Sequence, residues 1–221
     1  MKKRNIVIML VVGITSLCTT APIMAVTESC THGKKTFNDK KILSGVGNYG
    51  NNKRYYWINS NFSSNYSSRI RNAFSYWINT SSDPGVTTSI SFRESSNKSD
   101  ATIELHTTTL GGDTTGKTDY YSYSTLVDDQ SIQDWTWNII YIDTDKTKDY
   151  GQRKKTGLVG HEIGHAMGLS HQPNKQNSSI MYNYDDRYIL SDNGNTAIER
   201  NKPAKVDCNN INHIYKYSIF Y

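Results

Sequence analysis

One eleven-residue stretch, from His161 to His171, constrains this chain more than any other part of its sequence. It reads His-Glu-Ile-Gly-His-Ala-Met-Gly-Leu-Ser-His. Residues four apart lie one turn above each other on the same face of an α-helix, so His161 and His165 can direct imidazole nitrogens at one point. Imidazole nitrogens bind zinc at about 2 Å. The stretch therefore predicts a helix that carries two ligands of a zinc ion.

A third ligand at His171 is out of helical phase with the first two. Gly168 predicts the end of the helix, because glycine adopts left-handed backbone conformations without a Cβ penalty. The chain can then turn and bring His171 to the metal. Three neutral imidazoles leave a fourth position for water, which is the arrangement of a catalytic zinc. Glu162, one residue round the helix from the first ligand, is the candidate general base for that water.

A methionine lies ten residues after the last histidine of the motif, in the sequence Ser179-Ile180-Met181-Tyr182. The histidine motif and this methionine together resemble the metzincin zinc endopeptidases, whose signature includes a methionine turn. The match looks closest to the matrixins, the family of matrix metalloproteinases and their bacterial relatives. A pattern near the end of the chain is also similar to the closing helix of that family: Asp207, Ile211, Ile214 and Tyr215.

The resemblance implies an α+β, metzincin-like catalytic domain. Its mixed, twisted sheet has two long helices above it, and a small lower subdomain holds the methionine turn and a C-terminal helix. We expect this domain over residues 54–221, with the upper subdomain ending at about residue 171 and the lower one covering 172–221. A substrate cleft lies between the two. Met181 would then be the hydrophobic base under the metal and not a ligand.

The chain of 221 residues begins with Met1-Lys2-Lys3-Arg4 and an apolar run from Ile6 to Ile14. A basic start, a short apolar run and a small residue at Ala25 predict a secretory signal peptide over residues 1–25. Residues 26–53 are polar and predict a leader or a loosely held strap. Three of the 25 Lys and Arg residues lie in the signal and none of the 20 Asp and Glu residues does, so removal lowers the net charge from +5 to +2. That balance predicts no nucleic-acid partner.

Cys18 lies inside the predicted signal, which leaves Cys30 and Cys208 for the exported protein. In an oxidising compartment two cysteines predict one disulfide. An alternative is that Cys30, next to His32, binds the zinc transiently through its thiolate. No membrane anchor or sorting signal is recognisable, so we expect a soluble, extracellular monomer.

Apolar periodicity predicts most of the remaining elements. Tyr55 to Ile58 predicts a strand, and Ser63 or Ser64 can cap a helix with Tyr66, Ile70, Phe74, Trp77 and Ile78 as its packed stripe. Strands are also predicted around Ile90 and Phe92, around Ile103 and Leu105, and at Asn138 to Ile142, the last buried within the sheet. The zinc helix is predicted from about Lys154 and a last helix from near Pro203. Close packing of the zinc helix against a sheet would explain its glycines 157, 160 and 164.

Residues 107–130 are rich in Gly, Thr, Asp and Tyr and predict a solvated loop at the rim of the cleft. Acidic side chains in this loop can hold calcium, but their spacing matches no calcium loop, so a site cannot be placed: Asp113, Asp119, Asp128 and Asp129. The other histidines, His32, His106 and His213, are predicted to be surface or packing residues. Asn183 stands where astacins and serralysins have a tyrosine ligand and matrixins usually have proline, and the matrixin pro-domain is not recognisable.

These features predict a secreted zinc endopeptidase that acts on protein or peptide substrates with one catalytic zinc ion. His161, His165 and His171 would hold the metal, and Glu162 would activate its water. One alternative takes Glu199 as third ligand, as thermolysin-like enzymes take a downstream glutamate, but the motif expected around such a residue is missing. A second alternative is a secreted zinc-binding module, or latent pseudoenzyme, on the same scaffold.

Overall fold

The computed structural model describes residues 35–48, 50, 53–172, 179–182, 188–190 and 197–215. All of them belong to one compact unit, Thr31–Tyr221. The predicted signal peptide, Cys30, His32 and Asn183 lie outside the described residues. The predictions made for them therefore stay predictions.

Six strands form one mixed sheet in the order β2-β1-β3-β6-β4-β5. The neighbours β2-β1, β1-β3 and β3-β6 are parallel, whereas β6-β4 and β4-β5 are antiparallel. The predicted mixed sheet is thus confirmed, and β6 lies inside it as expected. The strands are β1 Arg54–Ile58, β2 Phe92–Glu94, β3 Ile103–Thr107, β4 Gly116–Ser122, β5 Thr125–Leu126 and β6 Trp137–Ile142.

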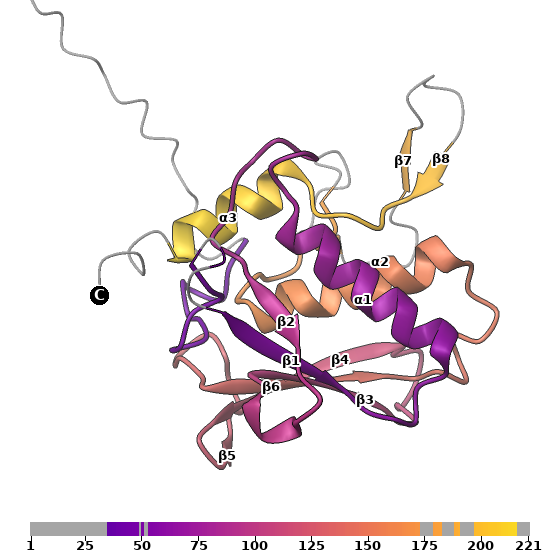
Figure 1. Ribbon diagram of the computed structural model, residues 1–221, viewed down its shortest axis with the longest axis horizontal. Helices are drawn as coiled ribbons and strands as arrows, with labels where there is room; N and C mark the ends of the chain where they lie inside the picture. The colour runs from indigo at the N-terminus through magenta and orange to yellow at the C-terminus, as the bar shows by residue number, and fades with distance from the viewer. Residues whose placement is uncertain are drawn as a thin grey trace, which may run out of the picture. The chain divides into compact units, whose positions relative to one another are not determined.

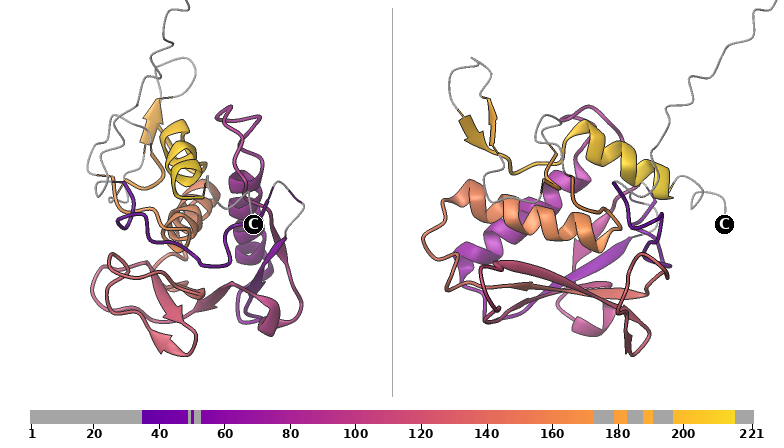
Figure 2. Two further views of the ribbon diagram at one scale, coloured as in Figure 1. Left: turned by 90° about the vertical axis from the view of Figure 1, so that its left-hand side faces the viewer. Right: turned by 180° about the vertical axis from the view of Figure 1, so that it is seen from behind.

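Two long helices, α1 (Ser64–Ile78) and α2 (Gln152–Ala166), pack against each other above one face of this sheet (Figure 1). A third helix, α3 (Lys205–Tyr215), lies on the side of α2 that faces away from the sheet (Figures 1 and 2). A short 3-10 helix, η1 (Lys98–Asp100), follows β2, and β7 (Tyr188–Leu190) pairs with β8 (Ala197–Glu199) in a separate antiparallel sheet. The expected layers of sheet, two long helices and a C-terminal helix are therefore present.

The helix α1 forms as its sequence predicts. Ser63 accepts a hydrogen bond from the backbone N–H of Tyr66 and so caps the first turn. The predicted stripe faces inward, and Phe74 stacks on Tyr56 of β1 with ring centroids 3.7 Å apart. Such a pair contributes about 0.5–1.5 kcal/mol beyond the area it buries. This contact fixes α1 over the parallel half of the sheet.

The stretch 107–130 departs from the solvated loop that its composition predicts. It contains β4, which pairs with β6 from Gly116 to Tyr121, and the short β5. Three residues of β4 face α2: Gly116, Thr118 and Tyr120. The first two are small or polar, and only Tyr120 has a large apolar ring. An alternating apolar pattern is therefore missing, because this end of the strand faces polar groups of α2.

Residues 35–48 are held more firmly than the loose strap that their composition predicts. Thr36 forms an antiparallel bridge with Leu169, and Ile42 a parallel bridge with Trp135. The side chains of Ile42 and Val46 are completely buried in the core. This segment therefore belongs to the folded domain.

No helix formed by the described residues combines the length and the apolar character that a membrane span needs.

Candidate metal centre

Helix α2 places His161 and His165 one turn apart, with their ring planes nearly perpendicular at 86°. The Nε2 atoms of the two imidazoles are 3.0 Å apart. Both side chains are at least nine-tenths buried. Val159 and Ile163 are completely buried in the core. Apolar side chains on one side and two histidines on the other thus fix the rotation of α2 about its axis.

Three glycines of α2 allow the helix to approach its neighbours closely, but these neighbours are not the expected sheet. A Cβ on Gly157 would lie 2.3 Å from the backbone oxygen of Arg200, and one on Gly160 2.7 Å from Cδ1 of Ile180. A Cβ on Gly164 would lie 2.3 Å from the sulfur of Met181. The glycines therefore pack the helix against the methionine turn and the segment before α3.

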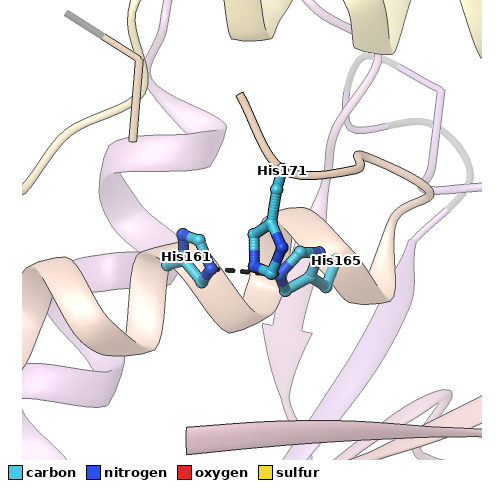
Figure 3. Close-up of side chains that lie close together, drawn as sticks. All are labelled: His161, His165 and His171. Atoms are coloured by element: carbon cyan, nitrogen blue, oxygen red, sulfur yellow. Dashed lines mark hydrogen bonds between the residues drawn. The ribbon is translucent and has the colours of Figure 1, made fainter. Parts of the chain in front are cut away.

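Gly168 ends the helix as its sequence predicts. Its φ is +107°, and its N–H bonds the carbonyl of His165. A Cβ there would lie 2.6 Å from the backbone oxygen of Lys40, so both conformation and space require glycine. The turn returns the chain toward α2, and His171 comes to lie with its Nε2 3.1 Å from that of His165 (Figure 3).

The hydrogen bonds of the buried histidines determine which ring nitrogen carries the proton. Nδ1 of His161 is 2.8 Å from the carbonyl oxygen of Ile180, and Nδ1 of His165 is 2.8 Å from that of Leu169. A carbonyl oxygen only accepts, so each Nδ1 must donate. Each Nε2 of a neutral ring then has a lone pair, and the two lone pairs face each other. A cation bound between the two nitrogens would remove this repulsion. Metal-binding histidines commonly donate their other ring N–H to a backbone carbonyl in the same way.

The three histidines His161, His165 and His171 are the group among the described residues whose nitrogen atoms lie close enough to share a metal ion. The potential ligand atoms are within 4.8 Å of one another. Three nitrogen ligands suit zinc, copper or iron better than calcium or magnesium. The chemistry of the donor set therefore fits the zinc that the motif predicts.

Glu162 is buried between α2 and β4. Its Oε2 accepts a hydrogen bond of 2.8 Å from the hydroxyl of Thr118, and a Cβ on Gly116 would lie 2.8 Å from its Oε1. Neither β4 residue was singled out in the sequence. Gly116, Thr118 and Tyr120 alternate along the sequence, as residues on one face of a strand do, and this spacing could have indicated the strand. The segment was instead predicted to be a loop.

Tyr120 continues this face of β4 beyond Thr118. Burial raises the pKa of its phenol well above the ordinary value, and the charges of Glu162 and Asp119 raise that pKa further. The ring of Tyr120 meets Phe37 edge to face, and Phe37 stacks on the imidazole of His165 at a centroid distance of 5.7 Å. The segment that contains Phe37 was expected to be only a strap, yet it supports one of the three histidines.

The methionine turn lies against α2, with the sulfur of the fully buried Met181 facing Gly164. The side chain of Asp207, from the first turn of α3, holds the turn. It accepts hydrogen bonds from the Ser179 hydroxyl, from the N–H of Ile180 at 3.0 Å and from the N–H of Ala204 at 2.7 Å. Burial raises the pKa of this carboxyl and the three hydrogen bonds lower it.

The remaining residues named from the sequence have other surroundings. His106 bonds Glu104, and His213 bonds Asp39. Cys208 is a buried, free thiol whose pKa burial raises to about 12. The four acids considered as calcium ligands form no metal-binding group among the described residues. Asp119 pairs with Lys117, and Asp129 accepts a hydrogen bond from the N–H of Ser131. The disulfide stays a prediction, and calcium stays without an assigned site.

Comparison with known proteins adds a family match. A family model described as Matrixin matches residues 52–216. No curated protein matches the sequence.

Comparison with solved structures finds distant similarity. One is the high choriolytic enzyme 1, a hatching enzyme zinc-protease from Oryzias latipes (Medaka fish), with 18% identity, a TM-score of 0.43, and coverage of 76% of this chain and 90% of that one. Two structures of myroilysin each have 15% identity and a TM-score of 0.45, covering 78% and 81% of this chain and 95% and 92% of those chains. The assignment of a family therefore depends on the matrixin match.

Proposed function

The chain belongs to the matrixin family and is a zinc metallopeptidase, and from this premise we propose that it is a secreted endopeptidase with Glu162 as its general base. The zinc ligands would be His161, His165 and His171. One observation carries the proposal: the Nε2 atoms of the three imidazoles converge within reach of one ion, and the helix that carries two of them also carries the buried carboxyl group of Glu162. Export is supported by the signal-like residues 1–25.

His161, His165 and His171 would hold the zinc ion, which would supply Lewis acidity for polarising a peptide carbonyl and for making a water molecule acidic enough to lose a proton near neutral pH. Glu162 takes a proton from the attacking water and passes it to the leaving amine. The carbonyls of Ile180 and Leu169 hold the two buried imidazoles in the tautomer that leaves Nε2 for the metal.

The edge of β4 is a candidate binding site for an extended substrate. Thr115 and Tyr121 use their carbonyls to bond Asp143 and Thr136, on the side of β6. In an antiparallel strand alternate residues face opposite sides, so the N–H and C=O of Gly116 and Thr118 face away from β6. Within the described residues, β5 pairs with β4 only at Tyr121 and Ser122. A peptide strand added here would pass beside Glu162.

Metal removal tests the proposal first. A zinc chelator is expected to abolish hydrolysis of a diverse quenched peptide library, and added zinc is expected to restore it.

Metal analysis of variants checks the ligands: His171→Ala should lose the bound zinc because its Nε2 completes the group, while Glu199→Ala should keep it. Zinc lost from Glu199→Ala and retained by His171→Ala would instead support the thermolysin-like alternative.

Thr118 is expected to be a positioning residue for the general base. In Thr118→Val the side chain keeps its shape but cannot donate to Glu162, so kcat should fall about 10-fold through misplacement of the carboxylate. The KM and zinc content should not change, because neither substrate backbone contacts nor the histidines are altered. The matched control is Thr118→Ser, which retains a hydroxyl and should retain kcat. Equal kcat in Thr118→Val and the wild type would refute this role.

A further inference from the structure

The loop between β3 and β4 is folded around the side-chain ammonium group of Lys146. The Nζ atom donates to three backbone carbonyl oxygens, those of Leu110 at 2.5 Å, Gly112 at 2.7 Å and Thr114 at 3.1 Å. An ammonium group has three N–H donors and no acceptor. The loop therefore supplies one carbonyl oxygen for each donor.

A carboxylate completes the group of oxygen atoms. Oδ2 of Asp143 lies 3.5 Å from the ammonium of Lys146 and also accepts the N–H of Leu110 at 2.9 Å. Its Oδ1 accepts the N–H of Lys146 at 3.0 Å. These two backbone hydrogen bonds hold the pKa of Asp143 below its ordinary value, so the side chain is ionised at neutral pH.

Three backbone carbonyls and one carboxylate form the kind of oxygen donor set that binds a hard cation such as Ca²⁺. Here a side chain of the same polypeptide provides the positive charge. We propose that the loop of residues 110–114 is a cation site whose cation is the ammonium group of Lys146, so that the loop needs no metal ion to keep its shape. The proposal depends on the fold alone and not on peptidase activity.

The position of this site gives it a consequence for the metal centre. The loop runs into β4, and the carbonyl of Thr115 bonds the N–H of Asp143 at 2.9 Å. The next residue, Gly116, lies against the carboxylate of Glu162. Lys146 and Asp143 therefore fix the start of the strand that contacts the proposed general base.

Thermal unfolding of the zinc-loaded protein in calcium-free buffer tests the proposal. The Tm of the wild type is expected to be the same with and without millimolar CaCl2. Lys146→Ala removes the tethered cation and leaves space among the oxygens, so its Tm should fall by about 2–5 °C. Millimolar CaCl2 should restore part of this loss, because the carbonyls and Asp143 can then bind Ca²⁺.

The control is Lys148→Ala, which removes an exposed lysine on the same segment and should change neither the Tm nor its response to calcium. A wild-type Tm that rises with calcium would overturn the proposal, and it decides the matter even if Lys146→Ala fails to fold. A Tm of Lys146→Ala equal to that of the wild type would also overturn it. So would a loss that calcium does not restore at all. Because the readout is unfolding, an inactive enzyme would leave the result valid.

Discussion

Glu162→Gln is expected to lower kcat for peptide hydrolysis by about 10³-fold, the range that a lost general acid–base costs. The amide keeps the size of the side chain and its bond to the hydroxyl of Thr118, but it cannot take a proton from water. Glu162 is buried against Gly116, so bulk water has poor access to replace it. Zinc content and Tm should stay close to those of the wild type, because the three histidines are unchanged.

The measurement is kcat on one peptide selected from the library, with zinc determined in the same sample. Glu94→Gln is the control, because that glutamate lies in β2, which three strands of the sheet separate from β4, and bonds Arg71, so its loss should leave kcat unaltered. Activity of Glu162→Gln within tenfold of the wild type would exclude Glu162 as the base. A wild-type protein that binds zinc and cleaves no peptide would instead support the alternative of a zinc-binding module.

The sequence was sufficient to predict those helices and strands whose own residues show a complete apolar, capping or ligand pattern. The stripe of α1, with Ser63 as cap, needs only helical periodicity and a capping side chain. The histidine motif fixes both the helical part of α2 and its end at Gly168. For β6 a short, strongly apolar run gave the strand and its place inside the sheet.

The missed parts depend on contacts between segments far apart in the chain. The strand β4 has no apolar alternation at Gly116 and Thr118, because Glu162 and not the core lies opposite. The strap around Phe37 has a loop-like composition, and only its pairing with residues 168–170 makes it part of the domain. The neighbours of the α2 glycines could not be identified either, since small residues predict close approach without naming the partner.

The metal centre shows the same division between local and long-range information. The motif predicted which histidines converge, because their spacing follows from one helix and one turn. It contained no information about the groups that hold them, such as the carbonyl of Ile180 at His161 or the ring of Phe37 at His165. Those supports come from the methionine turn and the strap, and they arise only when the chain has folded.

Asp207→Ala is expected to lower the free energy of unfolding by about 3–5 kcal/mol, the range for breaking a buried polar network. The carboxylate is completely buried and accepts hydrogen bonds from Ser179, Ile180 and Ala204. Truncation leaves all three donors without a partner, and each buried unsatisfied group costs about 1–3 kcal/mol. Chemical denaturation of the zinc-free protein measures this effect without a contribution from metal binding.

The isosteric control, Asp207→Asn, should lose clearly less stability, because the amide oxygen can take the place of Oδ2 and accept from both Ile180 and Ala204. Equal losses in the two variants would mean that negative charge, and not the hydrogen bonds, is the important property.

The structure also predicts an effect of Asp207→Ala on zinc binding. The carbonyl of Ile180 holds the ring of His161, and Asp207 holds Ile180. Asp207→Ala should therefore weaken zinc binding by about 10-fold or more, as loss of outer-sphere support does at other metal sites. Zinc affinity unchanged from that of the wild type would show that the methionine turn keeps its position without this carboxylate.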